Sequence, residues 1–168
     1  AMLSGGHLLV EDAPGMGKTS LARALGHHLQ LDWSRLRCTN DTTPSDIVGV
    51  NIFDPKSGDF HFRQGPVFTQ LLLADELNRA PSKSQSALLE AMAERQVTVE
   101  GSSFALPEPF IVIATQNPTE QIGVSPLPES QLDRFAVSFS LGLPSDAVES
   151  DILRDAVSGE ENFEQGEP

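Results

Sequence analysis

The sequence predicts an α/β fold built on a parallel sheet, and two observations support this prediction. Segments with the apolar pattern of strands alternate with segments of helical periodicity, as in α/β domains. Several of the strand segments are apolar throughout, which is typical of strands covered by helices on both faces of the sheet. The expected strands are residues 7–11, 34–39, 70–76, 110–116 and 136–141, and the expected helices are 20–30, 82–95 and 129–134.

The helices are predicted from periodicity and from proline placement. Apolar residues recur at helical intervals in residues 20–30 and form one face of residues 82–95. Pro44 stands where a first helical turn tolerates proline, which indicates a short helix after Thr43.

Two β-hairpins are predicted as inserts in this alternation. Residues 51–54 and 59–63 flank the turn sequence Pro55-Lys56-Ser57-Gly58. Residues 96–99 and 103–106 flank a turn at Glu100-Gly101.

The composition bounds the class of protein. A chain of 168 residues with 39% hydrophobic residues can form one domain with a core, which excludes disorder throughout. The apolar runs are far shorter than the ~20 residues of a membrane span, and no signal sequence precedes them, so we expect a cytoplasmic protein. A single cysteine, Cys38, excludes an internal disulfide.

The charge makes nucleic acid an unlikely partner. The formal net charge is −13, whereas nucleic-acid binding normally uses a clustered basic face. The chain has no Tyr and one Trp, Trp33, so it offers few aromatic platforms for stacked bases.

A glycine-rich loop between the first strand and the first helix has the residues of a phosphate-binding site. Gly15 and Gly17 let backbone N–H groups face phosphates, Lys18 can reach the β and γ oxygens, and Thr19 can ligate Mg²⁺. Asp12 stands where the strict pattern has its first glycine. The alternative is an ordinary glycine-rich turn.

Polar residues at the ends of two later strands complete the pattern. The apolar run Leu71 to Ala74 delivers Asp75, suited to a Mg²⁺ site, and Glu76, suited to polarising an attacking water. The strand ending at Asn117 presents an amide that can orient the same water or contact a γ-phosphate. The alternatives are two solvated acids that cap a strand and a turn-forming Asn before Pro118.

Taken in order, these motifs resemble the AAA+ ATPases, and most closely the MoxR family, over residues 7 to about 145. The resemblance implies a three-layer αβα P-loop domain with a five-stranded sheet in the order 5-1-4-3-2. It also implies a ring, usually hexameric, with ATP between subunits and hydrolysis coupled to remodelling of partner proteins or to metal insertion. The two hairpins resemble inserts of the clade that this family shares with magnesium chelatase and the replicative helicases. The matching segments are 11–19, 64–68, 74–81, 87–92, 114–118 and 132–135.

The resemblance also implies a role for individual residues. Lys18 and Thr19 match the Walker A pair, within a nucleotide-binding set of Pro14, Gly15, Met16, Gly17, Lys18, Thr19 and Ser20. Asp75 and Glu76 match the Walker B pair, with Thr19 and Asp75 at the metal, and Asn117 matches sensor 1.

Two arginines match positions that act on a neighbouring subunit. Arg134 matches the arginine finger, with pairing to Asp133 or Glu129 as its alternative. Arg79 is a second candidate for a contact in trans, and its alternative is an ion pair with Glu76 of its own chain.

The expected organisation is an ATPase core at residues 1–144, the first helix of a lid at 145–158, and a disordered acidic tail at 159–168. Most of the family's helical lid, its second sensor arginine and its N-terminal adenine-pocket segment have no counterpart here. We expect the natural chain to begin earlier. These differences bear on nucleotide affinity, ring formation and turnover.

The function predicted from the sequence is Mg²⁺-dependent ATP binding and hydrolysis by a chaperone-like ring. Its expected ligands are ATP, ADP and Mg²⁺, and its expected partners are copies of itself and client proteins, including clients with von Willebrand factor A-type domains. The alternatives are a nucleotide-binding switch or adaptor without turnover, a DNA motor of the related helicase clade, and a scaffold that binds no nucleotide.

Overall fold

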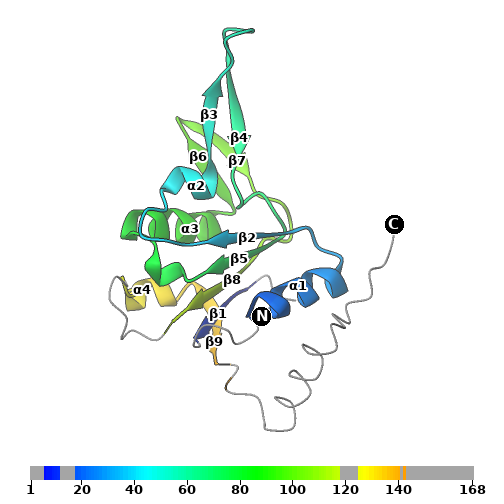
Figure 1. Cartoon of the computed structure of the whole chain (residues 1–168), viewed down its shortest axis with the longest axis vertical. Helices are drawn as coiled ribbons and strands as arrows, with labels where there is room; N and C mark the ends of the chain where they lie inside the picture. Colours follow the sequence, from blue (N-terminus) through cyan, green and yellow to red (C-terminus); the bar gives the residue numbers. More distant parts are fainter. Residues whose placement is uncertain (1–5, 12–17, 118–124, 141, 143–168) are drawn as a thin grey trace, which may run out of the picture.

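A five-stranded sheet with all strands parallel forms the centre of the molecule (Figure 1). The computed structural model describes residues 6–11, 18–117, 125–140 and 142. The strands lie in the order β2-β5-β8-β1-β9, which is the expected order 5-1-4-3-2 seen from the other edge. Their bounds are β1 His7–Glu11, β2 Trp33–Arg37, β5 Leu71–Asp75, β8 Ile111–Gln116 and β9 Phe135–Phe139.

The hydrophobic core lies on both faces of this sheet because successive residues of a strand point to opposite sides. On one face, Leu71 and Leu73 of β5 cluster with Ala22 of α1 (Lys18–Leu29). On the other, Leu72 and Ala74 cluster with residues of α3 (Ser82–Glu94). Burial on both faces explains the unbroken apolar runs of β5 and β8 and confirms the three-layer prediction.

In the described part of the chain, three short helical elements accompany the layers: α2 (Pro44–Val48), the 3₁₀ helix η2 (Leu77–Arg79) and α4 (Glu129–Leu132). A capping box starts α2. The Asp46 N–H donates to Thr43 Oγ1 over 3.3 Å, and the Thr43 N–H donates to the Asp46 carboxylate over 2.8 Å. Pro44 occupies the first turn, as the sequence predicts.

Both predicted hairpins are present, at the end of the molecule drawn uppermost in Figure 1. The first pairs β3 (Gly49–Phe53) with β4 (Phe60–Gln64), and the second pairs β6 (Gln96–Val99) with β7 (Ser102–Ala105). The ring of Phe62 stacks on the ring of Phe104 with centroids 4.1 Å apart, so the hairpins support each other. At the base of the first hairpin, a Cβ on Gly65 would lie 2.4 Å from the Ile47 carbonyl oxygen, so only glycine fits there.

Several predicted boundaries were wrong by one or two residues. The first helix begins at Lys18 and ends at Leu29, and β2 covers residues 33–37 instead of 34–39. The strand predicted to end at Glu76 ends at Asp75, because Glu76 has a left-handed backbone (φ 56°, ψ 46°) that cannot continue a strand. The last helix ends at Leu132 and the last strand begins at Phe135.

The expected lid helix and acidic tail, residues 145–168, lie outside the described residues. Among the helices that the structure describes, none is long and apolar enough to cross a membrane.

His7 connects strand β1 to the adjacent strand β8 and to helix α3. Its ring is buried, with Nδ1 accepting from the Val112 N–H over 3.0 Å and Nε2 lying 3.3 Å from the Met92 carbonyl oxygen. This pattern fits a neutral ring that carries its proton on Nε2. Burial lowers the pKa of His7 from 6.5 to about 4, and the charge of Arg95 adds to this effect.

Acid should therefore destabilise the fold through His7. In the unfolded chain His7 takes up a proton near pH 6.5, whereas in the folded chain it does so near pH 4. The stability contributed by neutral His7 is complete above pH 6.5 and is lost as the pH falls toward 4, and it amounts to roughly 3 kcal/mol. Urea unfolding between pH 7 and pH 4 measures this loss. Between these two pH values, the control His27→Gln, at an exposed histidine, should lose as much free energy of unfolding as the parent, and His7→Gln should lose less. An equal loss in all three chains would refute the assignment.

Candidate functional site

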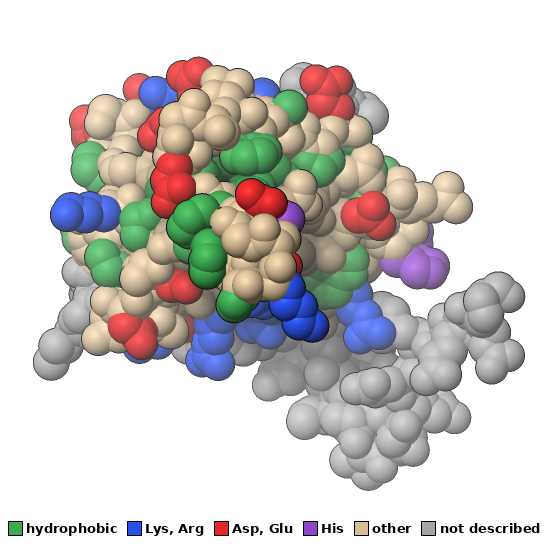
Figure 2. All heavy atoms as spheres, turned by 90° about the horizontal axis from the view of Figure 1, so that it is seen from above, with side chains coloured by type: hydrophobic (Ala, Val, Ile, Leu, Met, Phe, Trp, Pro, Cys, Tyr) green, Lys and Arg blue, Asp and Glu red, His purple; other side chains and the backbone are tan. Residues whose placement is uncertain are grey.

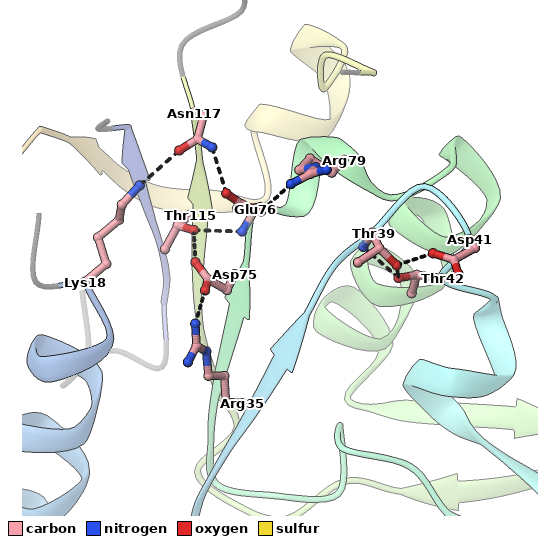
Figure 3. A network of polar contacts seen from close by, with 10 residues as sticks. All are labelled: Lys18, Arg35, Thr39, Asp41, Thr42, Asp75, Glu76, Arg79, Thr115 and Asn117. Carbon is pink, nitrogen blue, oxygen red and sulfur yellow. Dashed lines mark hydrogen bonds and ion pairs between the residues drawn. The ribbon is translucent and has the colours of Figure 1, made fainter. Parts of the chain in front are cut away.

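The polar residues singled out by the sequence meet where strands β5 and β8 end and helix α1 begins (Figure 3). Asp75 is the last residue of β5, Asn117 follows β8, and Lys18 is the first residue of α1. The carboxyl ends of parallel strands are the usual ligand site of such sheets. The Lys18 Nζ donates to the Asn117 Oδ1 over 3.5 Å, which brings α1 and β8 together.

The Asp75 carboxylate has a partner on each of its oxygens. The Thr115 hydroxyl donates to Oδ1 over 2.9 Å, and the Arg35 guanidinium of β2 donates to Oδ2. Burial opposes ionisation of Asp75, but the hydrogen bonds from Arg35 and Thr115, together with the charges of Arg35 and Lys18, outweigh it and hold the pKa of Asp75 below its usual value. Asp75 is therefore an anion held in one orientation.

The Glu76 carboxylate also has two partners. Asn117 Nδ2 donates to Oε1 over 2.9 Å, and Arg79 Nη1 donates to Oε2 over 3.0 Å. The Glu76 side chain is 16% exposed, so it stays reachable from solvent while its orientation is fixed. The Glu76 N–H donates to Thr115 Oγ1 over 2.9 Å, at the point where the backbone leaves the sheet.

Asn117 links the Lys18 cation to Glu76, the candidate base. Its amide oxygen faces Lys18 and its amide nitrogen faces Glu76. Asn78 Nδ2 donates to the Asn117 carbonyl oxygen over 3.0 Å, so the backbone that carries this amide is also held. Asn117 is 3% exposed and Asn78 is fully buried, which keeps this connection away from bulk water.

The other predicted site residues fall into three groups by their position. Thr19 and Ser20 lie in the first turn of α1 beside Lys18. Arg134 lies elsewhere: it is exposed, follows α4, and lines a hollow of about 340 Å³ together with Glu90 and Glu94 of α3. Pro14, Gly15, Met16 and Gly17 lie outside the described residues.

The arginine alternatives can be compared with observed ion pairs. Within the part of the chain that the structure describes, Arg134 forms no ion pair with Asp133 or Glu129. Arg79, in contrast, forms an ion pair with Glu76 of its own chain at 3.0 Å. The role of either arginine toward a second subunit stays a prediction.

Sequence reasoning missed three residues of this site: Arg35, Thr115 and Asn78. Thr115 could have been found, because it lies two positions before Asn117 and alternate residues of a strand share a face. Arg35 could not, because its contact with Asp75 depends on β2 pairing with β5. The contact of Asn78 with Asn117 depends on the 3₁₀ turn after Glu76, which no local pattern indicated.

The residues present fit a magnesium ion bound together with a phosphate. Mg²⁺ prefers oxygen ligands, keeps several waters, and is usually held by one or two carboxylates plus substrate phosphates. Asp75 supplies an ionised carboxylate and Thr19 supplies a hydroxyl. Among the described residues, no cluster of three or more His, Cys, Asp or Glu side chains could hold a metal ion.

Comparison with known proteins identifies the family. Residues 7–137 match the model of the ATPase family associated with various cellular activities (AAA). The chain belongs to the AAA family of ATPases. Among its AAA relatives, it is 46% identical to the chaperone MoxR1 of Mycobacterium tuberculosis over 90% of this chain and 40% of MoxR1, which confirms the MoxR resemblance. It is also 50% identical to the YeaC protein of Bacillus subtilis, over 91% of this chain and 48% of YeaC.

A solved structure supports the same conclusion at the level of the fold. A crystal structure of a provisionally assigned ATPase from Cytophaga hutchinsonii matches 95% of this chain and 48% of that protein, with a TM-score of 0.82 and 44% identity. This chain thus spans about half the length of the relatives that it matches.

Proposed function

We propose that this chain is the catalytic core of a MoxR-type ATPase that binds ATP and ADP with Mg²⁺ and hydrolyses ATP. The observation that supports this most strongly is the position of Asn117, whose single amide contacts both Lys18 and Glu76. A phosphate-binding cation and a water-activating carboxylate joined in this way are the two groups that phosphoryl transfer to water requires.

In the proposed reaction, each residue acts on a different part of the nucleotide. Lys18 and the N–H groups at the start of α1 attract the phosphates, and Pro14 to Gly17 directly precede them in the sequence. Thr19 and Asp75 would hold Mg²⁺, which would supply positive charge to neutralise the charge that develops on the phosphates. Glu76 accepts the proton of the attacking water, and Asn117 orients the Glu76 carboxylate.

The proposal is tested by measuring phosphate release from ATP by the purified chain, with excess Mg²⁺ and then with EDTA. We expect Mg²⁺-dependent release that stops when the metal is chelated. A chain that binds Mg-ATP, seen as a thermal shift, but releases no phosphate would instead support the nucleotide-binding switch. The observation that favours this second candidate is that both oxygens of Glu76 are already engaged, by Asn117 and Arg79.

We further propose that the site is completed by a neighbouring copy in a ring, which in the full-length protein is a hexamer acting on client proteins in the cytoplasm. Arg134 supports this proposal because it is exposed and lies away from the Glu76 site of its own chain. Among the described residues, it forms no ion pair. A guanidinium supplied in trans can stabilise transition-state charge.

Arg134→Ala should lower turnover by about 10³-fold or more at protein concentrations where the chain assembles, while nucleotide affinity stays unchanged. The measurement is phosphate release by each variant alone and by a mixture with Lys18→Ala chains. Partial recovery in the mixture is expected, because an intact Arg134 of one chain then faces an intact Lys18 of another. Failure to recover would assign Arg134 to its own subunit.

The surface of the hairpins favours a protein partner over DNA. The first hairpin exposes apolar side chains, with Phe53 51% and Phe60 67% exposed, and Figure 2 shows apolar side chains together with acidic and basic ones on the face seen from this end. The second hairpin, β6–β7, contains no Lys or Arg. Strong, salt-dependent binding of DNA would revive the alternative of a DNA motor.

A further inference from the structure

The hydroxyl of Thr115 joins the two acidic residues of the site. Its Oγ1 accepts a hydrogen bond from the Glu76 N–H and donates one to Asp75 Oδ1, each over 2.9 Å (Figure 3). A hydroxyl has one proton, and the Glu76 N–H can only donate, so the proton of Thr115 points to the Asp75 carboxylate. Both bonds are thus fixed in direction.

Thr115 is fully buried, so it can act only through its two partners. On the Asp75 side, its bond to Oδ1 and that of Arg35 to Oδ2 fix the plane of the carboxylate. Arg35 is 42% exposed and can exchange its partner for solvent, whereas Thr115 cannot. Thr115 is therefore the more rigid of the two supports.

On the Glu76 side, Thr115 stabilises an unusual backbone. The φ of 56° at Glu76 lies in the left-handed region, which is strained for a residue other than glycine and persists only where surrounding contacts hold it. The Glu76 N–H has left the strand ladder and finds its partner in Thr115, while the Glu76 carbonyl accepts from the Arg79 N–H over 2.8 Å. This turn aims the Glu76 carboxylate at Asn117.

We infer that Thr115 is the positioning residue of this site, whose hydroxyl couples the orientation of the metal-binding carboxylate of Asp75 to that of the base Glu76. The inference rests on the proposed function, because it concerns the same two acids. Glu76 is thereby held at two points, by Thr115 of β8 on its N–H and by Asn117, just after β8, on its carboxylate.

The test compares Thr115→Val, which keeps the shape and removes the hydroxyl, with Thr115→Ser, which restores it. The matched control is Thr69→Val, at a threonine that is also buried and donates to the Asp32 carbonyl oxygen over 2.9 Å before the opposite end of β5. Two readouts are used: the Mg²⁺ concentration needed for half-maximal ADP binding, and the hydrogen-exchange rate of the Glu76 amide in the nucleotide-free chain.

For Thr115→Val, we expect a tenfold to hundredfold higher Mg²⁺ requirement, the usual effect of losing a partner of a metal ligand, and faster exchange at Glu76. ADP binding in EDTA should not change. Thr115→Ser should restore both readouts toward the parent, and Thr69→Val should alter neither.

Two results would overturn the inference in different ways. If the parent binds ADP in a Mg²⁺-dependent manner and Thr115→Val does so with the same Mg²⁺ requirement, Thr115 has only a structural role and the proposed function stands. If the parent itself shows no Mg²⁺-dependent nucleotide binding, the proposed function fails and the inference fails with it.

Discussion

Replacing Glu76 by Gln should lower phosphate release by about 10²–10⁴-fold while leaving Mg-ATP affinity unchanged. A glutamine has nearly the same shape and can still accept from the Asn117 amide, but it cannot take the proton of the attacking water. The loss should therefore fall on the rate of hydrolysis and not on binding. The measurement is steady-state phosphate release at saturating Mg-ATP, combined with a binding titration.

The control for this change is Glu108→Gln, at an exposed glutamate just before β8 begins, at the end of that strand away from the site. It should turn over like the parent. A Glu76→Gln chain that also turned over like the parent would show that another group accepts the proton.

The second large effect is expected from Lys18→Ala, which should weaken binding of ATP and ADP by about tenfold to hundredfold. Hydrogen bonds to charged groups are worth about 1.5–3 kcal/mol, and each 1.4 kcal/mol corresponds to a factor of about ten in affinity. The Lys18 side chain is buried beside Asn117, so no solvent-exposed lysine can take its place. Isothermal titration with ADP and with ATP measures the loss.

Lys83→Ala, at an exposed lysine on α3, removes the same charge far from the phosphate loop in sequence and should leave both affinities intact. Unchanged affinity in Lys18→Ala would mean that the loop before α1 binds no phosphate.

Much of the fold could be predicted because its signals are local. The apolar runs of β5 and β8 and the periodicity of α3 reflect burial that each segment shows by itself. Strand order was different, since it followed from the family resemblance and not from the residues. The boundaries failed where the backbone departs from regular geometry, as at Glu76.

Residues of the site could be predicted from the sequence, but the contacts between them could not. Asp75 and Asn117 stand out because polar residues end apolar strands. The contacts of Arg35 with Asp75 and of Asn78 with Asn117 join residues that are 40 and 39 positions apart, so only the paired sheet and the turn after β5 create them.

The account is tested most directly by phosphate release per mole of chain, measured over a wide range of protein concentration with Mg²⁺ present and Glu76→Gln as the blank. We expect release above the blank that rises with concentration, because we propose that Glu76 and Asn117 supply the hydrolytic groups and that a neighbouring chain completes the site. Release that stays at the blank at every concentration, in a chain that binds Mg-ATP, would contradict the assignment of this site to ATP hydrolysis.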